Sequence, residues 1–139
     1  MKGQCFCGEV KYELTSDLLS CYYCHCTDCQ KFSGSAFHVL GRIKEKNFTL
    51  FSGNLSNHKH PTADGNEMTR EFCSNCGTPL FLKTTLFKGF RLIVIPSLDE
   101  PEKVKPKVEI WTKSKLSWAH ISPEVESFHK VETWDGLSF

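Results

Sequence analysis

The stretch F-C-S-N-C-G-T-P-L, residues 72–80, places two cysteines three positions apart and follows them with a glycine and a short apolar segment. Thiolates one to three residues apart converge on a single metal ion with bonds of about 2.3 Å, as in tetrahedral zinc sites. Gly77 can take the positive φ that lets backbone N–H groups point at thiolate sulfur. The stretch therefore predicts a zinc knuckle in which one strand ends at Cys73 and the next begins after Cys76.

The same order of residues occurs near the N-terminus, where Cys5, Cys7 and Gly8 precede a segment in which apolar and charged residues alternate, residues 9–14. This period of two is typical of a half-buried strand. Joined across a sheet, the two knuckles would make a closed four-thiolate zinc site with a structural role. Its ligands would be Cys5, Cys7, Cys73 and Cys76.

The other four of the eight cysteines lie together in the sequence. They are Cys21, Cys24, Cys26 and Cys29. If residues 20–24 are extended, Cys21 and Cys24 point to opposite faces of the strand. Cys21 is then a small buried apolar residue, and three ligands remain with an open fourth position, which is the pattern of a catalytic zinc. In the alternative interpretation all four cysteines form a second closed site that has no catalytic chemistry.

An even number of cysteines is also typical of a disulfide-stabilised secreted domain. The first ten residues, M-K-G-Q-C-F-C-G-E-V, lack the apolar core of a signal peptide. A C-x-C pair is also too short for unstrained disulfide geometry. The sequence therefore favours two zinc ions per chain over disulfides, and a cytoplasmic protein whose thiols are kept reduced.

The 139 residues indicate a single domain over residues 1–139. Seventeen basic and sixteen acidic residues give a net charge of +1. This small charge gives no indication that the protein binds nucleic acid or an anionic membrane. No apolar run approaches the roughly 20 residues that a membrane-spanning helix needs.

Further short strands are predicted at residues 48–51, 68–72, 79–82, 91–95 and 106–111, with turns between them. The pattern predicts a mainly β fold of antiparallel sheets. Helix is scarce, with one helical turn expected at residues 28–32.

Several motifs occur in a fixed order along the chain. They are G-x-C-x-C-G-x-V-x-Y at residues 3–12, C-H-C-x-x-C-x-K at residues 24–31, F-C-x-x-C-G-T-P-L at residues 72–80, S-L-D-x-P at residues 97–101 and I-W-T-x-S-x-L-x-W at residues 110–118. In this order and spacing the chain resembles the glutathione-dependent formaldehyde-activating (GFA) family, which also contains the centromere protein V domain.

The resemblance implies a β-tent fold, with a structural zinc on the two knuckles and a second zinc on Cys24, Cys26 and Cys29. It also implies the namesake activity, which joins glutathione to formaldehyde as S-hydroxymethylglutathione. The sequence departs from the family at two positions. Glu109 stands where many members carry His, and Cys21 is an additional cysteine.

The chemistry of three thiolates agrees with this activity. They give zinc a net charge of about −1, which makes it a poor generator of hydroxide and suits it to a sulfur as the fourth ligand. We therefore expect a carbon–sulfur lyase or synthase with a small thiol and an aldehyde as partners, and Cys24, Cys26 and Cys29 as its catalytic metal ligands. The alternative is a non-catalytic zinc module that binds a thiol or a protein partner.

Histidine, aspartate and tryptophan residues also have expected places in this fold. His25 is expected to turn outward or to donate a hydrogen bond beside the ligands, and Asp28 to be a turn or N-cap residue. The tryptophans are expected to lie in the core or to line a pocket. They are Trp111, Trp118 and Trp134.

Overall fold

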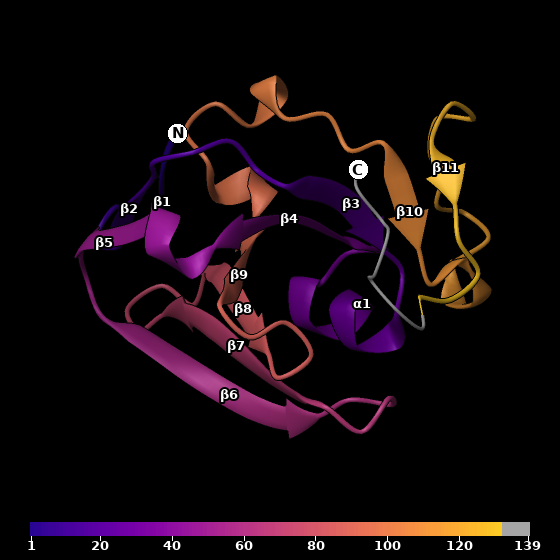
Figure 1. Cartoon of the computed structure of the whole chain (residues 1–139), viewed down its shortest axis with the longest axis horizontal. Coiled ribbons are helices and arrows are strands. Elements are labelled where there is room, and N and C mark those ends of the chain that lie inside the picture. The colour runs from indigo at the N-terminus through magenta and orange to yellow at the C-terminus, as the bar shows by residue number, and fades with distance from the viewer. Residues whose placement is uncertain (132–139) are drawn as a thin grey trace.

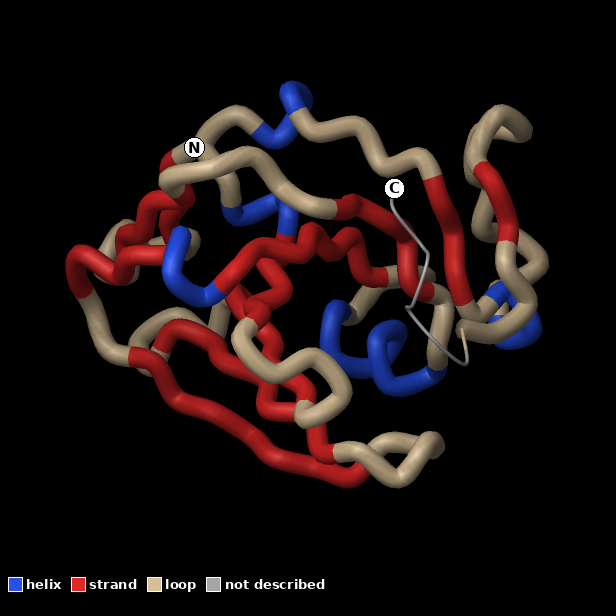
Figure 2. The backbone as a smooth tube through the Cα atoms, in the orientation of Figure 1, coloured by secondary structure: helices blue, strands red, loops and turns tan. Residues whose placement is uncertain are grey.

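Strands form most of the regular structure in residues 1–131, which are the residues that the computed structural model describes (Figure 2). The strands are β1 (Lys2–Gln4), β2 (Lys11–Leu14), β3 (Ser20–Cys24), β4 (His38–Lys44), β5 (Phe48–Ser52), β6 (Leu55–Pro61), β7 (Glu67–Cys73), β8 (Pro79–Thr84), β9 (Phe90–Val94), β10 (Val108–Ile110) and β11 (Glu126–Ser127). The helix α1 (Thr27–Ser33) is accompanied by short 3-10 turns η1 (Glu45–Asn47), η2 (Ile95–Ser97), η3 (Pro101–Lys103) and η4 (Thr112–Ser114). The mainly β class expected from the sequence is confirmed.

The strands form a small sheet of order β1-β2-β5 and a large sheet of order β11-β10-β3-β4-β9-β8-β7-β6. Most neighbours are antiparallel, as the sequence predicted, but β10 runs parallel to both β3 and β11. A parallel partner needs a long crossover. The crossover from β3 to β10 includes the intervening strands and ends with the segment after β9. This segment passes through η2 and η3 and brings β10 to the edge of β3 that is not paired with β4.

All of the predicted strands correspond to observed ones, namely β2, β3, β5, β7, β8, β9 and β10. The sequence pattern did not predict β1, β4, β6 or β11. The edge strand β6 has no buried residue and therefore lacks the apolar alternation on which the prediction depended. Gly41 and the charged Arg42 interrupt the apolar pattern of β4.

The large sheet has a core on each of its faces. One core contains Val10 and Tyr12 of the small sheet together with Phe81 and Ile93 of the large sheet. The second core contains Leu82 and Leu92, which point the opposite way from Phe81 and Ile93 on the same strands. The second core also contains Cys24 and Cys29, so one face of the large sheet carries the central cysteine cluster.

Helix α1 lies in the opening between β3 and β4 on one side and β6 and β7 on the other (Figure 1). Its first turn is capped by the side chain of Cys26, which accepts a hydrogen bond from the backbone N–H of Cys29. Its end is set by Gly34, whose positive φ of 64° lets its N–H donate to the carbonyl of Gln30. Among the described residues, no helix has both the length and the apolar character to cross a membrane.

Candidate metal centres

Four cysteines from the two predicted knuckles meet at the junction of the two sheets. Their sulfur atoms all lie within 4.8 Å of one another. The Sγ atoms of Cys5 and Cys7 are 3.4 Å apart, and those of Cys7 and Cys73 are 3.8 Å apart. The group consists of Cys5, Cys7, Cys73 and Cys76, as the sequence predicted, and it joins residues 66 positions apart in the chain.

The two knuckles have the same backbone geometry. Gly8 and Gly77 adopt φ values of 77° and 75°, which only glycine takes without strain. The N–H of Gly8 donates to the carbonyl of Cys5 at 3.0 Å, and that of Gly77 donates to the carbonyl of Cys73 at 2.9 Å. The backbone N–H of Val10 also donates to the Cys5 sulfur at 3.3 Å. The two knuckles thus hold their sulfurs with the same backbone hydrogen bond and the same glycine conformation.

A hydroxyl group supports the charged form of one of these thiols. The Oγ1 of Thr78 lies 3.0 Å from the Cys76 sulfur. Hydrogen bonds from the side chain and the backbone of Thr78 lower the pKa of Cys76 to about 6. Because metal ligation requires the thiolate, Thr78 favours ligation by Cys76 at neutral pH.

Three cysteines form a second group where β3 runs into α1. The sulfur atoms of Cys24, Cys26 and Cys29 lie within 4.8 Å of one another. Hydrogen bonds from the thiols of Cys24 and Cys29, together with the charge of Arg70, lower the pKa of Cys26 to about 3. The Cys26 sulfur also accepts the α1 N-cap hydrogen bond, so helix formation itself positions this thiolate.

Cys21 does not join the second group. On β3, Ser20, Tyr22 and Cys24 are buried, whereas Cys21 and Tyr23 alternate with them on the other face. Cys21 packs against the first core, and burial raises the pKa of its thiol to about 12. The sulfur is therefore held as a neutral thiol away from Cys24, Cys26 and Cys29.

A cavity of about 230 Å³ opens directly onto the three central thiols. Its walls are largely apolar, with Tyr22, Leu40, Met68, Leu82, Leu92 and Ile110 among them. Charged side chains also line it, and these are Asp28, Asp64, Arg70 and Lys113. The cavity gives a small molecule access to the thiols while its apolar walls limit the water around them.

Both groups have donor chemistry that fits zinc. Sulfurs bonded to one tetrahedral zinc at about 2.3 Å lie roughly 3.8 Å apart, which is similar to the separations between the knuckle sulfurs. The first group offers four thiols and closes the coordination sphere. The second offers three and leaves one position for another ligand.

Comparisons with known proteins agree with these features. Residues 1–114 match the sequence profile of the glutathione-dependent formaldehyde-activating enzymes. The chain belongs to the GFA family. It is also 24% identical over 148 aligned residues to a protein of Phaeosphaeria nodorum whose name gives it as a candidate glutathione-dependent formaldehyde-activating enzyme, with 99% of this chain and 77% of the relative covered.

A crystal structure of a Rhodobacter sphaeroides protein has a similar fold, with a TM-score of 0.59 and 21% identity. The alignment covers 76% of this chain and 92% of that protein. The similarity is one of fold.

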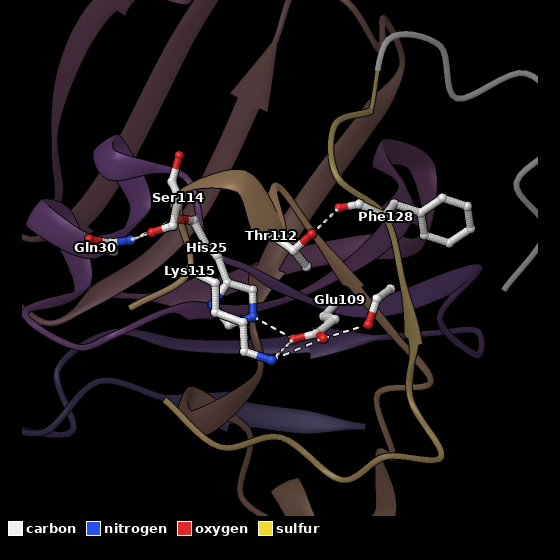
Figure 3. A network of polar contacts seen from close by, with 8 residues as sticks. His25, Gln30, Glu109, Thr112, Ser114, Lys115 and Phe128 are labelled. Carbon is white, nitrogen blue, oxygen red and sulfur yellow. Dashed lines mark hydrogen bonds and ion pairs between the residues drawn. The ribbon is translucent and has the colours of Figure 1, made fainter. Parts of the chain in front are cut away.

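Glu109, one of the two positions at which the sequence was expected to depart from the family pattern, lies in a buried polar network with His25 and Lys115 (Figure 3). Its Oε2 lies 2.8 Å from His25 Nε2 and accepts a hydrogen bond from Lys115, and its Oε1 accepts one from Ser127. Burial alone raises the pKa of Glu109, but the hydrogen bonds from Lys115, Ser127 and His25 outweigh burial and hold it below its ordinary value. Because an ionised carboxylate only accepts hydrogen bonds, His25 Nε2 carries a proton.

The network fixes the segment that carries the thiols. His25 is fully buried between Cys24 and Cys26, and it does not turn outward. It donates a hydrogen bond to Glu109 beside the candidate metal ligands, which is the second of the two arrangements expected from the sequence. The side chain of Gln30 donates to the carbonyls of His25 and Ser114 at 2.8 Å each, which ties α1 to the turn η4.

Asp28 and the tryptophans differ in where they lie. Asp28 lies in the first turn of α1, but the N-cap is Cys26. Trp111 lines the cavity and has a φ of 59°, a left-handed backbone conformation that is strained for a bulky residue. Trp118 is 66% exposed and belongs neither to the core nor to the cavity wall. Trp134 lies outside the described residues.

Arg70 is a site residue that the sequence reading missed. It lies on β7, and its Nη2 is 3.8 Å from the Cys29 sulfur. The only signal in the sequence was an arginine inside a predicted strand. Its position in a strand does not reveal that it is buried beside Cys29, which precedes it by 41 residues.

We expect the purified GFA chain to carry two zinc ions, because two separate thiol groups have tetrahedral spacing. Elemental analysis of protein prepared without chelators provides the measurement. The Cys21→Ser variant serves as the matched control and should keep both ions, since Cys21 lies on the opposite face of β3. A single ion in wild-type protein, or loss of an ion in Cys21→Ser, would contradict this assignment.

Proposed function

We propose that this protein catalyses the reversible addition of a small thiol to an aldehyde at the Cys24–Cys26–Cys29 group. The observation that carries the proposal is the difference between the two thiol groups. One has four sulfurs, whereas the other has three and faces a cavity. Glutathione and formaldehyde are the proposed substrates because the chain belongs to the GFA family.

The second thiol group is suited to hold zinc through Cys24, Cys26 and Cys29. A zinc ion bound there supplies a soft cation that lowers the pKa of an incoming thiol, so that the thiol reacts as thiolate at neutral pH. The residues of the chain provide the remaining parts of the site. Helix α1 holds Cys26 and Cys29 in place, and the apolar walls of the cavity strengthen electrostatic interactions with a charged sulfur.

The first core and the four-thiol group have no part in this chemistry. The cavity that opens onto the three central thiols has none of Cys5, Cys7, Cys73 or Cys76 in its walls. We therefore assign a structural zinc to the first group and the reaction to the second group alone.

The test measures how fast free formaldehyde exchanges with its glutathione adduct, by NMR exchange spectroscopy at equilibrium. Uncatalysed addition is already appreciable, so the enzyme must raise the exchange rate above that in buffer. We expect acceleration by wild-type protein and by Cys21→Ser, which alters a thiol on the other face of β3. We expect the acceleration to disappear in Cys26→Ser, since this change removes a thiolate ligand, whereas the serine hydroxyl can still cap α1.

Two outcomes would count against a lyase. Thiol binding without faster exchange would indicate a zinc module that only binds thiols. Equal acceleration by wild type and by Cys26→Ser would place the reaction outside the three-thiol group.

A further inference from the structure

Arg70 is a buried cation in the wall of the cavity. Only 5% of the residue is exposed, and it lines the same cavity as Cys24, Cys26 and Cys29. Its guanidinium carbon lies 4.3 Å from the centre of the Phe32 ring on α1. The side chain is therefore held between the sheet and the helix that contains Cys29 and is capped by Cys26.

Two of the three guanidinium nitrogens have partners. Nε donates to His60 Nε2 at 3.0 Å, and Nη2 donates to the Cys29 sulfur at 3.8 Å. The third nitrogen, Nη1, is buried and has no hydrogen-bond partner among the described residues. A buried donor without a partner is costly, and native structures rarely keep one unless a water or a ligand completes it.

Arg91 provides an internal comparison. It is also 5% exposed, but it forms ion pairs with Glu45 and Glu71 at 2.8 and 2.6 Å. Within residues 1–131, Arg70 has no such carboxylate partner. A buried arginine with a purely structural role would be expected to look like Arg91, whereas Arg70 has an unused donor next to a cluster of thiols.

We propose that Nη1 of Arg70 donates a hydrogen bond to the aldehyde-derived oxygen of the thiol adduct. This inference rests on the proposed function. An oxygen one carbon away from the substrate sulfur lies within reach of a guanidinium that already contacts the thiol group, whereas the carboxylates of glutathione are several bonds farther from its sulfur. Arg70 is then a catalytic residue that stabilises developing negative charge in a cavity with apolar walls.

Arg70 keeps its proton throughout the reaction. In the forward direction the thiolate sulfur forms a bond to the carbonyl carbon, and the C=O π electron pair moves to oxygen. The resulting alkoxide takes a proton from water. In reverse the hydroxyl group loses its proton, the C=O bond reforms, and the C–S bond breaks with its electron pair returning to sulfur.

The first test uses binding and does not depend on turnover. Thioacetate carries an oxygen on the carbon next to sulfur, and propane-2-thiol carries a methyl group in that place. For the zinc-loaded chain we measure the ratio of their dissociation constants by calorimetry, in wild type, Arg70→Met and Arg70→Lys. We expect the preference for thioacetate to fall about tenfold or more in Arg70→Met, as for loss of a charge-assisted hydrogen bond, and to be partly retained in Arg70→Lys.

A second measurement uses only the wild-type protein, so it is informative even where a variant fails to fold. Thioacetate should shift the guanidinium ¹⁵N resonances of Arg70, and propane-2-thiol should leave them nearly unchanged. Equal shifts with both ligands, or an unchanged binding ratio in well-folded, zinc-loaded Arg70→Met, would overturn the assignment.

The exchange assay separates this inference from the proposed function. If wild type accelerates exchange, Arg70→Met should lower the rate about tenfold to a hundredfold while zinc content stays the same. If wild type does not accelerate exchange, the proposed function fails. The binding ratio and the resonance shifts then still decide whether Arg70 recognises an oxygen beside the substrate sulfur.

Discussion

Cys73→Ser should lower thermal stability far more than Cys29→Ser. Cys73 belongs to the four-thiol group, which joins the N-terminal knuckle to a knuckle 66 residues away and closes a long loop of chain. Binding free energy at a closed structural zinc site is folding free energy, so loss of one ligand should reduce the free energy of unfolding by several kcal/mol. For a chain of this size we expect the melting temperature to fall by more than about 10 °C.

Cys29 belongs to the three-thiol group, where the proposed zinc would mainly serve an incoming ligand. Cys29→Ser should therefore lose zinc from the second group with a smaller drop in melting temperature. Calorimetric melting of both variants, with zinc content measured on the same samples, provides the comparison. Equal destabilisation would show that the two groups do not divide structural and catalytic roles.

Glu109→Leu should produce the second large effect. Removing one partner of a buried ionic network leaves the other groups uncompensated, and such changes cost about 3–5 kcal/mol when burial is complete. Lys115 is partly exposed, so we expect a loss on the order of 2–4 kcal/mol, measured by urea unfolding. The matched control is Glu100→Ala, which removes the exposed Glu100–Lys103 pair and should change stability by less than about 0.5 kcal/mol.

The contribution of Glu109 to the free energy of unfolding should depend on pH. The pKa of Glu109 is lower in the folded chain than its ordinary value, so the unfolded state binds more protons in the window between the two values. Its stabilisation is complete above the ordinary carboxyl pKa and is lost as pH falls through the folded value. The difference between wild type and Glu109→Leu should therefore shrink in acid, and a difference that is constant from pH 7 to pH 3 would exclude an ionised Glu109 as its source.

Local sequence rules predicted the features that depend on neighbouring residues. The knuckles followed from cysteine spacing and from Gly8 and Gly77, whose positive φ values are now observed. The two faces of β3 followed from side-chain alternation, which separates Cys21 from Cys24. The mainly β fold and membership of the GFA family followed from the strand pattern and the order of the motifs.

The features that were missed depend on contacts between distant segments. Arg70 meets Cys29 across 41 residues and His25 meets Glu109 across 84, and no local pattern encodes either distance. The parallel pairing of β10 likewise depends on the route of the chain after β9. The exposure of Trp118 was not predicted because composition gives the number of aromatic residues and not their positions.

Cys21 and Cys24 lie on opposite faces of β3, so metal binding at the three-thiol group depends on the register in which β3 pairs with its neighbours. A slip of one residue exchanges every side chain of a strand between its two faces. It would turn Cys24 away from Cys26 and Cys29 and present Cys21 instead, about 10 Å farther back along the strand and out of reach of the other two sulfurs. A misaligned chain could not assemble the three-thiol group, so zinc retained there reports that this strand has paired correctly.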